Sequence, residues 1–470
     1  MMGLKSWEGN MVESSKSPGM VHKVLRLFTV IHPGEATTAI LLTLNIYLLL
    51  MAYYIIKPVR EALIIGGQGA DVKSYLSAAS AIPLIFVIKA FSATASRFPR
   101  HKLITGVTLF FVSNLVIFYF LSLLNISSAI MGIIFFIWMA IFNVMVVAQF
   151  WGFANDLYSL EAGKRLFPLI AFGATFGGFS GATIAGWLVI PLGVYQMMLV
   201  AGGVLLLCIG LTWVIHLREI GKAKKPVTTV EGTPKEKTED KEKPLEKGGG
   251  FQLVFKKKYL LYIAIFVLLL NFINTNGEFI LGNYFEESAN ELMEMGKLGG
   301  LTVEQYIGKI SANWMKYFNL LAMIIQLFLV SRLFRWIGIR GAIFILPFIA
   351  LGGYMAIAIG ASLMMVFWVK VMENGTDYSL MNTTRHALFL ILSREEKYKA
   401  KAAIDTFFHR GGDVLSALLV FLGLNYLAFK TAGFAAFNVV LCVLFIGFGI
   451  LIAKEHKRLT TKREPDSSKN

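Results

Sequence analysis

Four charged residues, with His386 beside them, lie within one apolar stretch, VKVMENGTDYSLMNTTRHALFLIL at residues 369–392: Lys370, Glu373, Asp377 and Arg385. A charge at the middle of a membrane costs about 2.5–3.5 kcal/mol, so such residues usually face a polar cavity or one another. At about 100° per residue, these side chains fall within an arc of about 120° on a helix. We therefore expect them to line a path for a charged solute. Structural pairing of Lys370 with Glu373 or Asp377 is the alternative.

Other apolar stretches also carry isolated polar residues. Lys57 precedes Pro58, which removes a backbone donor and bends a helix close to a cation. Asn274 and Glu278 share one helical face, and Lys89 lies in the run IPLIFVIKAF. We expect these residues to face the same cavity, and an interfacial lysine that reaches the membrane surface is the alternative for Lys57.

The composition indicates a membrane protein. Of 470 residues, 56% are hydrophobic and 16% charged, and the mean hydropathy is +0.64. The net charge of +16 is concentrated in short segments between apolar runs, which indicates positive-inside topology rather than binding to nucleic acid. Cys208 and Cys442 lie in apolar runs and have no zinc or disulfide spacing, so we expect packing roles. No cleavable signal peptide is expected at the N-terminus.

The apolar runs predict an all-α membrane protein with twelve transmembrane helices in two six-helix halves and both termini in the cytoplasm, because a span needs about 20 apolar residues. The predicted spans are residues 37–57, 74–95, 102–124, 127–153, 166–190, 193–216, 259–285, 312–333, 337–357, 360–391, 404–428 and 432–453. The predicted organisation is a cytoplasmic segment at 1–36, six-helix bundles at 37–216 and 251–453, a disordered cytoplasmic linker at 217–250, and a basic tail at 454–470.

The two halves show an internal similarity. Segments that begin at Ser159 and Ser393 both read Ser-x-Glu, then basic residues, then Gly-Gly at the same distance. Parallel halves around a central linker are the plan of major facilitator transporters. The sequence has no GxxxxGK[ST] or HExxH motif, so we expect neither an ATP-driven pump nor an enzyme, and no cofactor or metal.

Two segments resemble the nucleotide translocase family, whose members exchange ATP and ADP. Residues 150–174 carry a Phe-Trp-x-Phe-Ala-Asn element that ends at Asn155. Residues 378–413 carry a Tyr-Ser-Leu element and a Lys-Ala-Ala-Ile-Asp element that ends at Asp405. Weaker matches at Lys57 and at Asn274 with Glu278 extend the resemblance over most of residues 50–415.

The sequence departs from the family pattern at two positions. The family has an acidic residue early in the fourth span, and residues 127–150 contain neither Asp nor Glu. Arg385 stands where the family has a lysine, so the charge is kept. Because the acidic residue of the fourth span is absent, the sequence leaves the identity of the substrate open.

The leading hypothesis is a secondary antiporter of phosphorylated anions such as ATP and ADP that works by alternating access. Lys57 and Arg385, one from each half, would hold phosphate oxygens, and Arg385 can bind two of them in its fork. Acidic residues would pair with the cations when the site is empty, which enforces exchange. The expected substrate-binding residues are Lys57, Lys89, Asn155, Asn274, Glu278, Lys370 and Arg385, and the expected ion-pairing residues are Glu373, Asp377 and Asp405.

Two other functions stay open at this point. A proton-coupled transporter of another small solute or drug would use Glu278 or Asp377 as the proton carrier. A membrane receptor or scaffold would act through the linker, but it has no need for a charged cavity. We expect a multi-pass protein of a bacterial inner membrane, whose partners are an anionic small molecule and the lipid bilayer. The oligomeric state is not predicted.

Overall fold

Helices account for nearly all of the described chain. The computed structural model describes residues 35–95, 98–124, 127–158, 160–223, 250–393 and 396–467. The first half contains α2 (Ala36–Gln68), α3 (Ala70–Ala79), α4 (Ala81–Ala95), α5 (Arg100–Leu123), α6 (Ser128–Leu157), α7 (Leu160–Leu192) and α8 (Gln196–Ala223). The second half contains α9 (Gly250–Lys256), α10 (Lys258–Glu294), α11 (Val303–Ile324), η1 (Ile325–Leu329), α12 (Val330–Ala342), α13 (Ile345–Ile359), α14 (Leu363–Thr376), η2 (Asp377–Met381), α15 (Asn382–Leu388), η3 (Glu396–Ala400), α16 (Lys401–Ala403), η4 (Ile404–Phe408), α17 (His409–Asn425) and α18 (Thr431–Ser467).

Ten helices among the described residues are long and apolar enough to cross a membrane. Two further predicted spans correspond to shorter elements. Predicted span 337–357 overlaps α13, which has 15 residues and ends at Ile359. Predicted span 360–391 contains α14, η2 and α15, where polar residues and a π-helical turn interrupt the apolar run. The chain is therefore an all-helical, multi-pass membrane protein.

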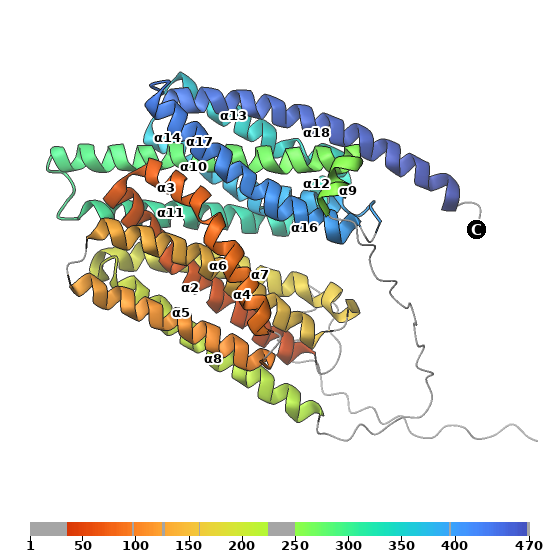
Figure 1. The fold of residues 1–470 in the computed structure, drawn as a ribbon, viewed down its shortest axis with the longest axis horizontal. Helices are drawn as coiled ribbons and strands as arrows, with labels where there is room; N and C mark the ends of the chain where they lie inside the picture. Colours follow the sequence, from red (N-terminus) through yellow and green to blue (C-terminus); the bar gives the residue numbers. More distant parts are fainter. Residues whose placement is uncertain are drawn as a thin grey trace, which may run out of the picture.

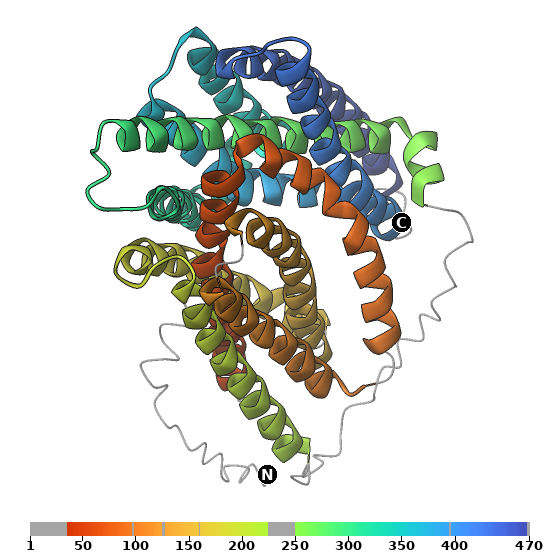
Figure 2. The same ribbon diagram turned by 60° about the vertical axis from the view of Figure 1, so that its left-hand side comes forward.

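The two halves lie side by side, with α2 to α8 in the lower part of Figure 1 and α9 to α18 in the upper part. We call the end where α8 and α18 finish the linker end, and the opposite end, where α2 passes into α3 at Gly69, the closed end. Figure 2 shows α3 beside the helices of the second half. There the backbone N–H of Ala70 donates to the Glu286 carboxylate at 3.0 Å, so α3 joins α10 at the closed end.

Close packing of α7 on α2 fixes the helix that carries Lys57. Glycines recur every fourth residue on α7, and a Cβ at Gly177 or Gly181 would lie 2.3 Å from the carbonyl oxygen of Tyr47 or Met51. No larger side chain fits at that distance, so the two backbones touch. This contact holds α2 in place along its length.

Several element boundaries differ from the predicted ones. α2 continues to Gln68, eleven residues beyond the predicted end at Lys57, because its Pro58 is accommodated inside the helix. Lys57 therefore lies within the helix rather than at its end. α8 continues to Ala223, into the predicted linker. Residues 224–249, the rest of that linker except Gly250, lie outside the described residues.

Contacts between the halves gather toward the closed end. Gln305 of α11 donates to the carbonyl oxygen of Ile190 on α7 at 3.4 Å. Ile65 packs with Ala289 and Ile307 of the second half in a small buried cluster. The linker-end pair Arg100–Asp156, by contrast, joins two elements of one half. The halves are thus held together on one side of the cavity described next.

Candidate functional site

A cavity of about 490 Å³ lies between the two halves. Its volume is within the range of about 300–1,000 Å³ that is typical of small-molecule sites. Cationic side chains outnumber acidic ones in its lining. The lining cations are Lys57, Arg60, Lys73, Arg385 and Arg410; the acids are Glu278, Asp377 and Asp413; the amides are Asn143, Asn271, Asn274 and Asn382; and the aromatic residues are Tyr53, Phe136 and Tyr378.

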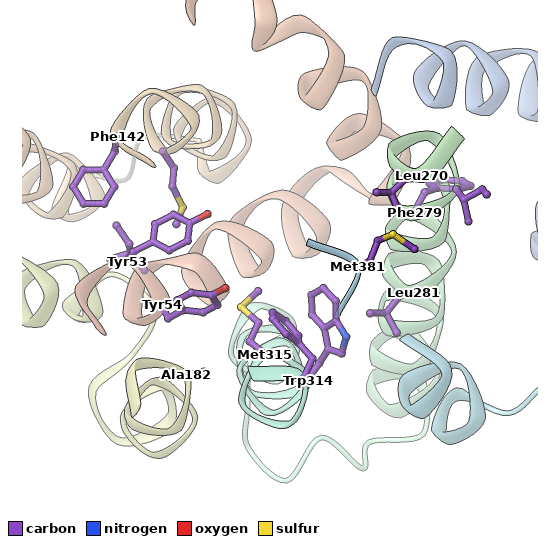
Figure 3. Packing of buried hydrophobic residues seen from close by; sticks show 14 of the residues in the cluster. Tyr53, Tyr54, Phe142, Ala182, Leu270, Phe279, Leu281, Trp314, Met315 and Met381 are labelled. Carbon is purple, nitrogen blue, oxygen red and sulfur yellow. The ribbon is translucent and has the colours of Figure 1, made fainter. Parts of the chain in front are cut away.

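Lys57 lies among aromatic rings rather than acids. Its Nζ is 5.4 Å from the ring centroid of Tyr54, 5.9 Å from that of Tyr53 and 5.8 Å from that of Phe318. Figure 3 shows Tyr53 and Tyr54 between Phe142 of α6 on one side and α11 on the other. Within the described part of the chain, Lys57 has no ion pair. Ring faces attract a cation without forming an ion pair with it, so this side chain remains available to a ligand.

A cluster of ion pairs lies next to Lys57. Glu61 accepts from Arg60 of α2 and from Lys73 of α3, the latter at 2.8 Å. Lys73 also contacts Glu278 of α10 at 3.2 Å, and so it joins the two halves across the cavity. The Arg60 guanidinium lies over the Phe136 ring, 4.7 Å from its centroid.

The second half supplies two arginines to the cavity. Arg385 pairs with Asp405 at 3.3 Å, and Arg410 pairs with Asp413 at 3.2 Å. Asp413 also accepts from Asn271 at 2.8 Å and from Thr275 at 2.9 Å, both on α10. These hydrogen bonds hold α17 against α10 and fix the carboxylate that orients Arg410.

Lys370, predicted to bind substrate, does not reach the cavity. Its side chain is fully buried, and it donates to Glu373 at 2.9 Å and to the Asn274 side-chain oxygen at 3.1 Å. Glu373 also accepts from the Tyr354 hydroxyl at 2.7 Å. Gly277 makes room for this group, since a Cβ there would lie 1.8 Å from the Tyr354 oxygen. The alternative of a structural Lys370–Glu373 pair is therefore the arrangement that the structure has.

The group nevertheless acts on the cavity through Asn274. An ammonium has only donors, so the Asn274 atom that faces it must be oxygen. Asn274 lines the cavity, and its amide nitrogen has no hydrogen-bond partner among the described residues. The Asn274 amide nitrogen can therefore donate a hydrogen bond to a ligand in the cavity.

The predicted polar stripe divides in two along the length of the helix. Lys370 and Glu373 lie one to two helical turns before Asp377, beside Tyr354 and Asn274, and η2 shifts the helical phase only for residues after Asp377. Lys370 and Glu373, before that turn, point into the protein, whereas Asp377 and Arg385 line the cavity. Helical phase alone cannot show which residues of one face meet a cavity and which meet packed neighbours.

The remaining predicted site residues lie elsewhere. Asn155 is exposed near the end of α6 and does not line the cavity, because α6 presents Phe136, Ala140 and Asn143 there instead. Asp405 contributes only through its pair with Arg385. Lys89 belongs to α4, and its side chain lies outside the described part of the structure.

Sequence reasoning missed several lining residues, chiefly Lys73, Arg410 and Asp413. Lys73 precedes the predicted start of the second span at residue 74, so it read as a loop residue. Arg410 and Asp413 follow the Lys-Ala-Ala-Ile-Asp element at a spacing of three residues, which is a signal for an i,i+3 pair on one helical face.

A family model described as TLC ATP/ADP transporter matches residues 121–458, well over half of the chain. The chain belongs to the TLC ATP/ADP transporter family. The matched range includes Glu278 and Arg385, while Lys57 and Lys73 precede it. No curated protein matches this TLC family member.

Solved structures share the fold of this TLC family member. A bacterial homologue of the human lysosomal transporter Spinster, inward-facing and unoccupied, aligns with a TM-score of 0.57 at 16% identity over 92% of this chain and 99% of that chain. The nucleoside transporter NupG aligns with a TM-score of 0.56 at 12% identity over 90% and 99%. Both are major facilitator transporters, and at these identities the likeness shows the fold. The family shows a membrane transporter, and its fold is like that of these two structures.

Proposed function

We propose that this transporter exchanges nucleotides such as ATP and ADP across a bacterial inner membrane by alternating access. The observation that carries the proposal is the placement of Lys57, an ammonium without an acidic partner among the described residues, in a cavity that also receives Arg385 and Arg410 from the other half. Guanidinium and ammonium groups from both sides suit a ligand with several phosphate oxygens. The family match is consistent with this ligand.

Other lining groups suit the rest of a nucleotide. Tyr53, Phe136 and Tyr378 offer apolar ring surface to a base, and the amide nitrogen of Asn274 offers a hydrogen bond to an acceptor. Asn143 and Asn382 add groups that both donate and accept. We assign the phosphates to the cations and the base and sugar to the rings and amides.

The proposed topology follows from the same arrangement. We propose twelve spans in two six-helix halves with both termini in the cytoplasm, so that the linker end faces inward. The contacts at the closed end would then separate when the cavity opens outward, which is the rocking motion of alternating access. The segment between α8 and α9 would be a cytoplasmic linker.

Uptake of labelled ATP into proteoliposomes tests the proposal. We expect uptake when the vesicles contain ADP, and little uptake when they contain buffer or a phosphorylated anion without a base. Equal uptake with and without internal nucleotide would contradict exchange. Absence of uptake under every loading, with folded protein, would contradict nucleotide transport.

Asp377 supports a second candidate, a proton-coupled transporter of another small solute. It lines the cavity and forms no ion pair within the described residues. A carboxyl group in this position can carry a proton between the two sides. Solute uptake driven by a pH gradient into vesicles without counter-substrate, and abolished by Asp377→Asn, would favour this candidate over exchange.

A further inference from the structure

We propose that Lys73 is a further substrate-binding cation, beside Lys57, Arg385 and Arg410, and that it accepts the anion in exchange for Glu278. This inference rests on the proposed function. It adds a residue from α3, before the range that the family model matches, and it assigns Glu278 a role in holding the empty transporter shut.

The first observation is the distribution of charge around Lys73. Its ammonium contacts Glu61 of its own half at 2.8 Å and Glu278 of the other half at 3.2 Å. Glu61 is also the partner of Arg60, so one carboxylate is shared by two cations. Glu278, on the other side of the cavity, supplies a second carboxylate for these two cations.

The second observation is access. Lys73 and Glu278 both line the cavity, and the Glu278 side chain keeps 20% of its surface exposed. Lys57 and Arg60 line the same wall. A phosphate group that approaches Lys57 therefore meets the Lys73 ammonium and the Glu278 carboxylate together. Like charges repel, so the phosphate favours contact with Lys73 and displaces Glu278.

The third observation links this exchange of partners to the closed end. α3 meets α10 at Lys73–Glu278 and, about two helical turns further along α10, at Ala70–Glu286. Anion binding removes the first of these contacts and leaves the second, which weakens the joint between the halves. In the empty transporter, opening would separate a buried cation from its partner, and this is costly. Only the loaded transporter opens readily, so exchange is enforced.

Opening of the closed end can be measured with a single new cysteine. Ala289 is fully buried in the cluster with Ile65 and Ile307 at the closed end. Both native cysteines, Cys208 and Cys442, are buried and free, so they give little background. The experiment measures the rate of maleimide labelling of the full-length Ala289→Cys protein in detergent, with and without ATP.

We expect ATP to speed labelling of Ala289→Cys. With Glu278→Gln added, labelling without ATP should rise by roughly tenfold, the change that about 1.4 kcal/mol produces, and ATP should add little. Lys73→Gln should also lose the ATP response, and Lys73→Arg should restore it. The matched control is Glu286→Ala, which removes the acceptor of the Ala70 N–H outside the cavity and should keep the ATP response.

Two results would overturn the inference while leaving nucleotide transport intact. One is a Glu278→Gln protein that is labelled as slowly as its parent and responds to ATP as its parent does. The other is a Glu286→Ala protein that behaves as Glu278→Gln does, since the effect would then be general loosening of the interface. If ATP has no effect on the parent and does not bind to it, the proposed function itself is overturned, and this inference with it.

Discussion

Lys57 and Lys370 are two lysines within apolar helices, and they have opposite surroundings. Lys370 is fully buried behind the cavity, with Glu373 at 2.9 Å and the Asn274 oxygen at 3.1 Å. Lys57 is 6% exposed, lines the cavity and lies among three aromatic rings. A lysine whose donors are all used by protein groups is part of the scaffold, and one that is held by ring faces alone is available to a ligand.

Removing Lys370 should give the largest effect. Lys370→Met leaves the Glu373 carboxylate buried without its cation, which should cost about 3–5 kcal/mol of stability. The double variant Lys370→Met with Glu373→Gln removes both charges and should recover part of that loss. Thermal unfolding of the purified proteins measures both. A Lys370→Met protein as stable as the wild type would show that the pair is not structural.

Removing Arg385 tests the cavity side of the comparison. Arg385→Ala should weaken ATP binding by roughly 10- to 100-fold, because a hydrogen bond to a charged group contributes about 1.5–3 kcal/mol. Arg385→Lys keeps the charge but loses the two-pronged geometry, so it should recover only part of the affinity. Uptake into ADP-loaded proteoliposomes checks the consequence for transport. Unchanged uptake by Arg385→Ala would remove Arg385 from the binding site.

Asn274 connects the buried group with the cavity. Asn274→Asp replaces the donor that faces the cavity by an acceptor, so ATP affinity should fall by about fivefold or more. Asn274→Leu removes the donor without adding charge and should have a smaller effect. A competition series of ATP, ADP and a nucleoside without phosphate distinguishes loss of a phosphate contact from loss of a base contact. An unaltered affinity in Asn274→Asp would place the ligand elsewhere.

A third lysine, Lys257, lies outside the membrane-spanning helices and should give the smallest effect. It pairs with Glu396, and the Ser393 backbone N–H donates to the same carboxylate at 2.8 Å. Burial raises the pKa of Glu396, but the hydrogen bonds from Lys257 and Ser393 outweigh burial and hold its pKa below the ordinary value.

Because the folded-state pKa of Glu396 is lowered, its contribution is complete above the unfolded pKa of about 4.3 and is lost as the pH falls through the folded value. Lys257 is 56% exposed, so Glu396→Gln should cost less than about 1 kcal/mol at pH 7. Melting curves at pH 7 and near pH 4 test this, with a difference between wild type and variant that shrinks at the lower pH. A difference that grows on acidification would contradict the assignment.

Most of the correct predictions came from the apolar runs and from the isolated charged residues within them. The helical class, the likeness to major facilitators and the family follow from them, and Lys57, Asn274, Glu278, Asp377 and Arg385 all line one cavity. These residues were predictable because a charged or amide side chain in an apolar helix usually faces a polar cavity or another polar group.

The rest depended on contacts between distant segments. Lys73 became part of the site only because α3 packs against α10, which no local pattern encodes. Lys370 is outside the site because Glu373 and Asn274 take up its donors and Gly277 makes room for Tyr354 beside Glu373. Asn276 of α10 donates to Asn438 of α18 at 2.8 Å and therefore stabilises helix packing rather than binding a ligand.

The most direct test of the account is the affinity of ATP for Lys57→Met, measured by calorimetry on purified protein beside the wild type. We predict that the wild type binds ATP and that Lys57→Met binds it roughly 10- to 100-fold more weakly while its unfolding temperature changes little. ATP binding of equal strength in both proteins would show that Lys57 does not hold the ligand, and would contradict the assignment of this cavity.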